Sequence, residues 1–185
     1  KSPWLAVKAH YEGQFSDKVV GLYNFKGGYC GVSKVEDNRI NICYLASYET
    51  FKEYKNSDWY QKEILEQNPH LKAIFQSTKL LFDKPLTISQ ISFEQKLPVE
   101  NHILMAGDAA GLITPLCGNG MAMAIHAGKL AAEALLDGKS RGEVESIYAK
   151  KWTAEFSQRL WVGRKVQGLF GSGGASVLAR NLIHH

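Results

Sequence analysis

The sequence has little cysteine, and its cysteines show no pattern that would hold a metal or a disulfide framework. Cys30, Cys43 and Cys117 lack the spacing of a zinc site, and three cysteines cannot all pair with one another. Sparse, unpaired cysteine is typical of a reducing compartment. No charged start followed by an apolar core and a small-residue cleavage site occurs at the N-terminus. We therefore expect free thiols in a cytoplasmic protein with no metal site.

An excess of charge of one sign is also lacking. The 22 Lys and Arg residues stand against 18 Asp and Glu, and the net charge of +4 is spread along the chain. Nucleic acid is therefore not expected as a partner. Residues 109–128 carry no charged side chain and approach the length of a membrane span. Their four glycines, with Pro115, Asn119 and His126, argue against one.

Short runs rich in Val, Ile, Tyr and Phe, separated by turn residues, occupy the first quarter of the chain. This pattern is typical of antiparallel strands. Asp37-Asn38, between two alternating runs, predicts a tight hairpin. The expected strands cover residues 4–12, 18–25, 28–35 and 39–46.

From Tyr48 to Leu81 the apolar residues take helical spacing. Pro69 is expected to separate two helices, and Ser57-Asp58 to cap a helix that starts near Trp59. Residues 86–93 alternate again and should return the chain to the sheet.

A continuous apolar run at 103–106 is typical of a buried parallel strand. After a glycine-rich loop, residues 121–136 form a helix with small residues at three- and four-residue spacing, which allows close approach to another backbone or a flat ligand. A last helix is expected over 143–169. The fold class is α+β, with an antiparallel or mixed sheet, then a strand-loop-helix and a C-terminal helix. The expected domains are 1–96, 97–140 and 141–185.

The loop after the apolar run holds the residues that indicate chemistry. A strand ending at Ala106 would place Asp108 at the carboxyl edge of a sheet, where it can accept hydrogen bonds. Gly107 permits a sharp turn, and Ala109 leaves room for a polyol chain to pass. Gly118 and Gly120 precede the helix, whose first N–H groups and dipole favour an anion such as the reduced flavin ring. Each feature alone also fits a capped turn, a glycine loop or a core helix.

Taken together, Gly107-Asp108-Ala109-Ala110, then Pro115, Gly118 and Gly120, then an Ala-rich helix, resemble a known motif. It is the second flavin motif of the FAD-dependent family that includes aromatic-ring hydroxylases and geranylgeranyl reductases. The match extends from Leu104 to Glu133.

The resemblance implies that Asp108 would hold the ribityl hydroxyls and that Pro115 would lie beside the flavin ring. Backbone N–H groups of Gly118, Asn119 and Gly120 would reach the ring. The full set of expected cofactor-binding residues is Gly107, Asp108, Ala109, Pro115, Gly118, Asn119, Gly120 and Met121. FAD is the implied cofactor, with NADH or NADPH as reductant.

The sequence also departs from that family. The Gly-x-Gly-x-x-Gly turn that binds the ADP portion of FAD, with an acidic residue about 20 positions later, is absent. We therefore expect a C-terminal half that lacks its N-terminal partner half, binds FAD weakly or not at all when isolated, and is inactive alone. Gly28-Tyr29-Cys30-Gly31-Val32 resembles the family's Gly-Tyr-x-Trp strand over the flavin, with Gly31 in place of the aromatic residue.

The expected activity of the whole protein is that of an oxidoreductase or dehydrogenase, either a reductase or a monooxygenase. Its substrate would be an apolar isoprenoid, aromatic or polyketide-like compound. Gly111, where the hydroxylases usually have His, slightly favours the reductase branch. Halogenases of the family carry Trp-x-Trp-x-Ile-Pro, which has no counterpart here. Cys117 and Tyr29 are the candidate catalytic residues, although buried packing is the commoner explanation for each.

A second hypothesis makes this chain a non-catalytic domain that binds a hydrophobic ligand or, less favoured, a membrane surface. Its evidence is the cluster of aromatic and basic residues in the last expected helix. Packing of the tryptophans on the sheet, with the charges in solvent, is the alternative explanation. The residues concerned are Trp152, Arg159, Trp161, Arg164 and Lys165.

Overall fold

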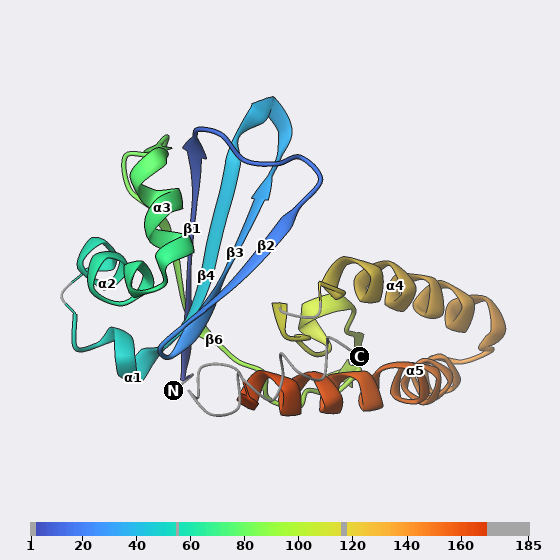
Figure 1. Ribbon diagram of the computed structural model, residues 1–185. Coiled ribbons are helices and arrows are strands. Elements are labelled where there is room, and N and C mark those ends of the chain that lie inside the picture. Colours follow the sequence, from blue (N-terminus) through green and yellow to red (C-terminus); the bar gives the residue numbers. More distant parts are fainter. Residues whose placement is uncertain (1–2, 55, 116–117, 170–185) are drawn as a thin grey trace, which may run out of the picture. The chain divides into compact units, whose positions relative to one another are not determined.

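The computed structural model describes residues 3–54, 56–115 and 118–169 of the chain. Its helices and antiparallel sheet confirm the α+β class (Figure 1). The chain divides into two compact units: the first includes the described residues up to Ser92, and the second covers Phe93–Gly168. The expected boundaries at 96/97 and 140/141 therefore differ from the observed division. The last two helices share one unit because their apolar faces pack on each other.

The four strands of the first 47 residues are confirmed within two residues. They are β1 (Trp4–Glu12), β2 (Val20–Phe25), β3 (Gly28–Lys34) and β4 (Ile40–Ser47). The strand order is β2-β3-β4-β1, and β1 also pairs with β5 (Lys79–Leu80) and β6 (Leu86–Ile91). Every pairing in this sheet is antiparallel.

The predicted hairpin at Asp37-Asn38 is confirmed. Both residues have positive φ, 57° and 56°, within the short helix η1 (Glu36–Asn38). The Val35 N–H donates to the carbonyl of Arg39 at 2.8 Å, which closes the turn. Asp and Asn tolerate the left-handed region better than other non-glycine residues, so this pair suits the turn.

Three short helices follow, and they cover one face of the sheet (Figure 1). They are α1 (Tyr48–Phe51), α2 (Ser57–Glu63) and α3 (Pro69–Ser77), with η2 (Leu65–Gln67) between the last two. Pro69 begins α3, as expected. The cap predicted at Ser57-Asp58 is wrong, because Asn56 has the extended backbone of an N-cap and its side chain accepts from the Trp59 N–H at 2.9 Å.

The core of the first unit lies between these helices and the sheet. Alternate residues of β1, namely Leu5, Val7, Ala9 and Tyr11, are buried in it. The same alternation places Cys30 of β3 and Tyr44 of β4 on that face, since the two are register partners. Tyr60 of α2 is fully buried among Phe25, Tyr44, Phe51 and Tyr54.

The second unit begins with a two-stranded antiparallel ribbon, β7 (Val99–Glu100) and β8 (Ile103–Leu104). The turn η3 (Gly107–Ala109) follows, then α4 (Gly120–Asp137) and α5 (Arg141–Leu169). The buried parallel strand expected over 103–106 is wrong: β8 has two residues, pairs antiparallel, and leaves Ile103 58% exposed. Within the described residues, no strand lies along its other edge to bury it.

The two long helices hold the core of this unit. Met123, Ala127 and Leu130 of α4 are buried against Tyr148 and Trp152 of α5. The helices were predicted as 121–136 and 143–169, so both are confirmed within two residues. No helix in the described part of the chain is long and apolar enough to cross a membrane.

Burial of ionisable groups in the first unit predicts loss of stability in alkali. Burial raises the pKa of Tyr11 to about 12 and raises the pKa values of Cys30 and Tyr44 well above their ordinary values. These groups stay protonated in the folded chain at a pH where the unfolded chain ionises. Their contribution is complete below about pH 9; that of Tyr11 is lost as the pH rises through about 12, and those of Cys30 and Tyr44 are lost at still higher pH.

We expect the free energy of unfolding, measured by urea denaturation followed by circular dichroism, to fall steadily from pH 9 to pH 11. Tyr44→Phe should make that fall shallower, because it removes one buried hydroxyl that has no hydrogen-bond partner among the described residues. Tyr48→Phe, at an exposed position, is the matched control. Superimposable pH profiles for wild type and Tyr44→Phe would contradict this account.

Candidate functional site

Gly107 begins the turn that the sequence singled out. Its φ is +57°, a left-handed conformation that favours glycine, and the chain tightens at once into η3 with the Ala110 N–H donating to the Gly107 carbonyl at 3.1 Å. A Cβ at Gly107 would lie 3.1 Å from the Cβ of Ala124. The turn therefore packs closely against α4 only because both positions are small.

This packing brings Asp108 to the start of α4. A Cβ built on Gly120 would lie 4.0 Å from Oδ1 of Asp108, so the carboxylate stands beside the first helical residue. The Asp108 side chain is exposed, as is Ala109. The carbonyl of Asp108 accepts a hydrogen bond from Nζ of Lys96 at 3.1 Å, which holds the turn from the other side.

The N-terminus of α4 lacks a capping side chain. Asn119 occupies the N-cap position without a side-chain hydrogen bond, and its carbonyl accepts from the Met123 N–H at 3.0 Å. The N–H groups of Gly120, Met121 and Ala122 therefore have no acceptor within the helix. The helix dipole adds partial positive charge there, and Asp108 supplies a compensating negative charge. A carboxylate that accepts hydrogen bonds and backbone N–H groups that donate them are thus close together.

The loop before α4 includes Pro115 and Gly118. Pro115 is exposed, and its carbonyl accepts from the Gly118 N–H at 3.0 Å. Gly118 has φ +61°, and a Cβ there would meet nothing within 4 Å. The candidate catalytic residue Cys117 lies outside the described residues, together with Leu116.

The predicted residues therefore fall into two groups. Asp108, between Gly107 and Ala109, is brought beside Gly120, and Met121 is the next residue of α4. Pro115, Gly118 and Asn119 lie in the loop that leads into the helix. Tyr29, the other candidate catalytic residue, is buried in the first unit, as expected of a packing residue.

Several contacts that support the turn could not be predicted from the sequence. The Tyr148 hydroxyl donates to the carbonyl of Met105, just before the turn. Just after the turn, a Cβ at Gly111 would lie 2.9 Å from Cδ1 of Leu160. Such contacts join residues more than 40 positions apart, so no local pattern could reveal them.

The sheet face away from the helices is the second notable surface. Its register places Leu22, Gly31, Cys43, Lys8 and Leu86 in one row across five strands. Leu22 and Leu86 at the two ends are exposed. Among the described residues, a Cβ at Gly31 would contact only the Cys43 carbonyl, at 3.8 Å, so there is space beside Gly31, while Tyr29 and Leu45 farther along the same face are buried. This face could accept an apolar molecule.

No protein-family profile matches the chain. Geranylgeranyl diphosphate reductase of Oryza sativa subsp. japonica is 34% identical over 37% of this chain and 15% of its own length. Digeranylgeranylglycerophospholipid reductase of Methanosarcina mazei is 42% identical over 28% of this chain and 14% of its own length. Conditioned medium factor receptor 1 of Dictyostelium discoideum is 27% identical over 70% of this chain and 26% of its own length. The chain thus spans about a quarter or less of these relatives.

Solved structures share the fold over most of the chain. The myxobacterial chondrochloren halogenase CndH, an FAD-dependent halogenase, matches with a TM-score of 0.69 and 16% identity over 86% of this chain and 40% of its own. PqsL of Pseudomonas aeruginosa, a probable FAD-dependent monooxygenase, matches with a TM-score of 0.67 and 16% identity over 93% of this chain and 50% of its own.

The chain therefore has the fold of FAD-dependent halogenases and monooxygenases. Parts of its sequence are also similar to geranylgeranyl reductases.

The close packing at Gly107 yields a stability prediction. Gly107→Ala should lower the free energy of unfolding by about 1–2 kcal/mol, because alanine is strained in the left-handed region and its methyl group crowds Ala124. Gly142→Ala is the matched control, since a Cβ there meets nothing within 4 Å and alanine favours α5. Thermal unfolding followed by circular dichroism measures both. A Gly107→Ala protein as stable as Gly142→Ala would show that the turn is not constrained as described.

Proposed function

We propose that this chain is the flavin-facing part of an FAD-dependent oxidoreductase. The observation that carries the proposal is the Asp108 carboxylate beside the uncapped N-terminus of α4. A flavin with its ribityl chain needs a hydrogen-bond acceptor and, a few ångströms away, donors for the electron-rich edge of the ring. The chain offers both within one turn and one helix end.

The residues present fit the cofactor. Asp108 would accept hydrogen bonds from the ribityl hydroxyls, and the absence of a side chain at Gly118, in open space, would let the ring approach the backbone. The N–H groups of Gly120 and Met121 would face the ring edge that becomes negative on reduction, which favours the reduced state. Bound FAD would supply the redox chemistry, and the protein would supply position and electrostatics.

We infer that a further part of the protein completes the site by binding the ADP portion of FAD. This inference is supported by the small share of the relatives' length that the chain covers. It is also supported by a stripe of exposed apolar residues on α4, away from its packing with α5, and by the unpaired edge of β8 within the described residues. The stripe consists of Met121, Ile125, Leu135 and Leu136.

For the substrate, we propose an apolar isoprenoid that would lie on the open row of the sheet, with reduction as the reaction and NADH or NADPH as the reductant. The names of two relatives, both reductases of geranylgeranyl compounds, support this choice. The open space at Gly31 and the exposed ends of the row support an apolar occupant. The halogenase and monooxygenase neighbours share the fold at low identity and do not favour either of those reactions.

The alternative is a non-catalytic binding domain. The relative aligned over most of the chain bears the name of a receptor, and Trp161 of α5 is 56% exposed. Trp152, by contrast, is buried against Phe156, so only part of the aromatic cluster could meet a hydrophobic ligand or a membrane.

The first test is a flavin absorbance and fluorescence titration of the longest native form of the protein and of this chain. We expect the longer form to bind FAD and this chain to bind it weakly or not at all. In the longer form, Asp108→Ala should weaken binding at least tenfold, because charge-assisted hydrogen bonds contribute about 1.5–3 kcal/mol each.

Asp17→Ala, at an exposed position in the first unit, is the control and should bind FAD like wild type. A longer form that binds no flavin would reject the proposed function and favour the binding domain. Unchanged affinity in Asp108→Ala would reject the role of this carboxylate.

A further inference from the structure

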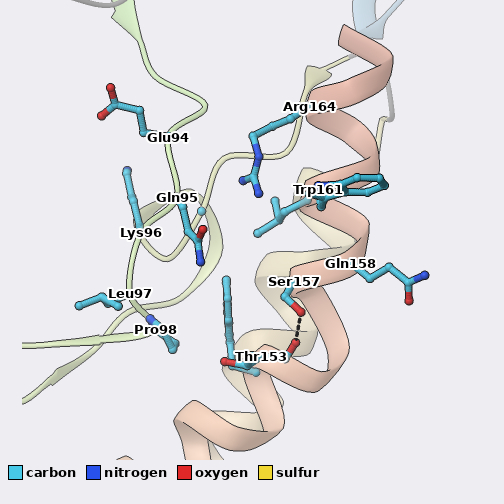
Figure 2. Close-up of a pocket in the computed structure, with 13 residues that line it drawn as sticks. Glu94, Gln95, Lys96, Leu97, Pro98, Thr153, Ser157, Gln158, Trp161 and Arg164 are labelled. Atoms are coloured by element: carbon cyan, nitrogen blue, oxygen red, sulfur yellow. Dashed lines mark hydrogen bonds between the residues drawn. The ribbon is translucent and has the colours of Figure 1, made fainter. Parts of the chain in front are cut away.

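A cleft of about 420 Å³ lies in the second unit between α5 and the segment that precedes β7 (Figure 2). It is separate from the face of α4 that carries the proposed flavin contacts. Its volume is within the range of small-molecule sites. The lining residues that matter here are Lys96, Leu97, Gly111, Leu160, Trp161 and Arg164.

The cleft has an apolar floor and side. Leu160 and Gly111 are buried at its base, where the missing side chain of Gly111 makes room for Cδ1 of Leu160. Leu97 and Trp161 are both more than half exposed along its walls. Exposed apolar side chains on both walls of a cleft indicate a ligand with an apolar body.

The charges of the cleft favour an anionic head group. Arg164 extends from α5 over the cleft toward Gln95 (Figure 2), and within the described residues its guanidinium has no ion pair. Lys96 stands on the opposite wall, and Glu94 is the one acidic side chain among the described residues of the lining. An unpaired guanidinium binds carboxylate or phosphate oxygens with two parallel hydrogen bonds.

We propose that this cleft binds a single-chain anionic amphiphile, with its carboxylate or phosphate on Arg164 and its hydrocarbon chain along Trp161, Leu97 and Leu160. The site is next to the back of the Asp108 turn. Lys96 joins the cleft wall to the Asp108 carbonyl, and Gly111 of the floor follows Asp108 by three residues. Binding here does not require flavin, so this proposal stands or falls independently of the proposed function.

The test uses bromine-labelled dodecanoate, whose bromine quenches tryptophan fluorescence on contact, at concentrations below micelle formation. We expect saturable quenching in the purified protein, most of which is lost in Trp161→Phe. Arg164→Glu should weaken binding at least tenfold, since it replaces a charge-assisted hydrogen bond by repulsion. Arg164→Lys should retain most of the affinity, and the neutral bromododecanol should bind less tightly than the carboxylate.

Arg159→Glu is the matched control. Arg159 is one to two turns away on the same helix, outside the cleft, and pairs with Glu155 at 3.8 Å. It should change affinity less than twofold. Circular dichroism of each variant checks folding, and Arg164→Gln replaces Arg164→Glu if the latter does not fold.

Three outcomes would overturn the proposal: no saturable quenching, equal weakening by Arg159→Glu and Arg164→Glu, or binding to anionic phospholipid vesicles without binding of the monomeric carboxylate. The last outcome would assign Trp161 and its basic neighbours to a membrane surface instead.

Discussion

The close approach of the Gly107 turn to α4 is the constraint on which the candidate site depends. It requires a left-handed backbone conformation at position 107, which glycine adopts readily. It also requires glycine at 107 and alanine at 124, because larger side chains would keep the turn and the helix apart. The approach places a carboxylate beside free N–H groups. Without it, Asp108 would be an exposed acid on a loop, and the N-terminus of α4 would be an ordinary solvated helix end.

The packing of α4 on α5 supports the position of the Gly107 turn against α4. Aromatic residues of α5, among them Trp152 and Phe156, fill the space under the small residues of α4. Tyr148 of the same helix donates to the Met105 carbonyl at the end of the ribbon, and Lys96 donates to the Asp108 carbonyl. The turn is thus fixed on both flanks by residues that take no part in the proposed flavin contacts. The cleft beside Arg164 shares this framework, so a single packing arrangement supports two neighbouring surfaces.

The sheet of the first unit divides its side chains between two faces by simple alternation. One face buries Tyr11, Cys30 and Tyr44 under the helices, and their raised pKa values follow from that burial. The opposite face carries Gly31 and the exposed Leu22, together with the buried Tyr29 and Leu45. A side chain that changes face would have different neighbours, because successive residues of a strand point in opposite directions.

The sequence by itself determined the local structure. Alternation predicted the four strands within two residues, Pro69 predicted the start of α3, and Gly107-Asp108-Ala109 marked the turn. Only the tertiary structure decided which distant residues these elements contact. It made Asn56 the cap of α2 and β8 a short exposed strand, it set the hydrogen bonds of Lys96 and Tyr148, and it placed Arg164 at the cleft. Periodicity reports which face of an element is apolar, but the partner of that face lies far along the chain. The apolar run at Ile103 predicted burial for this reason, although no element that would bury it lies in the described part of the chain.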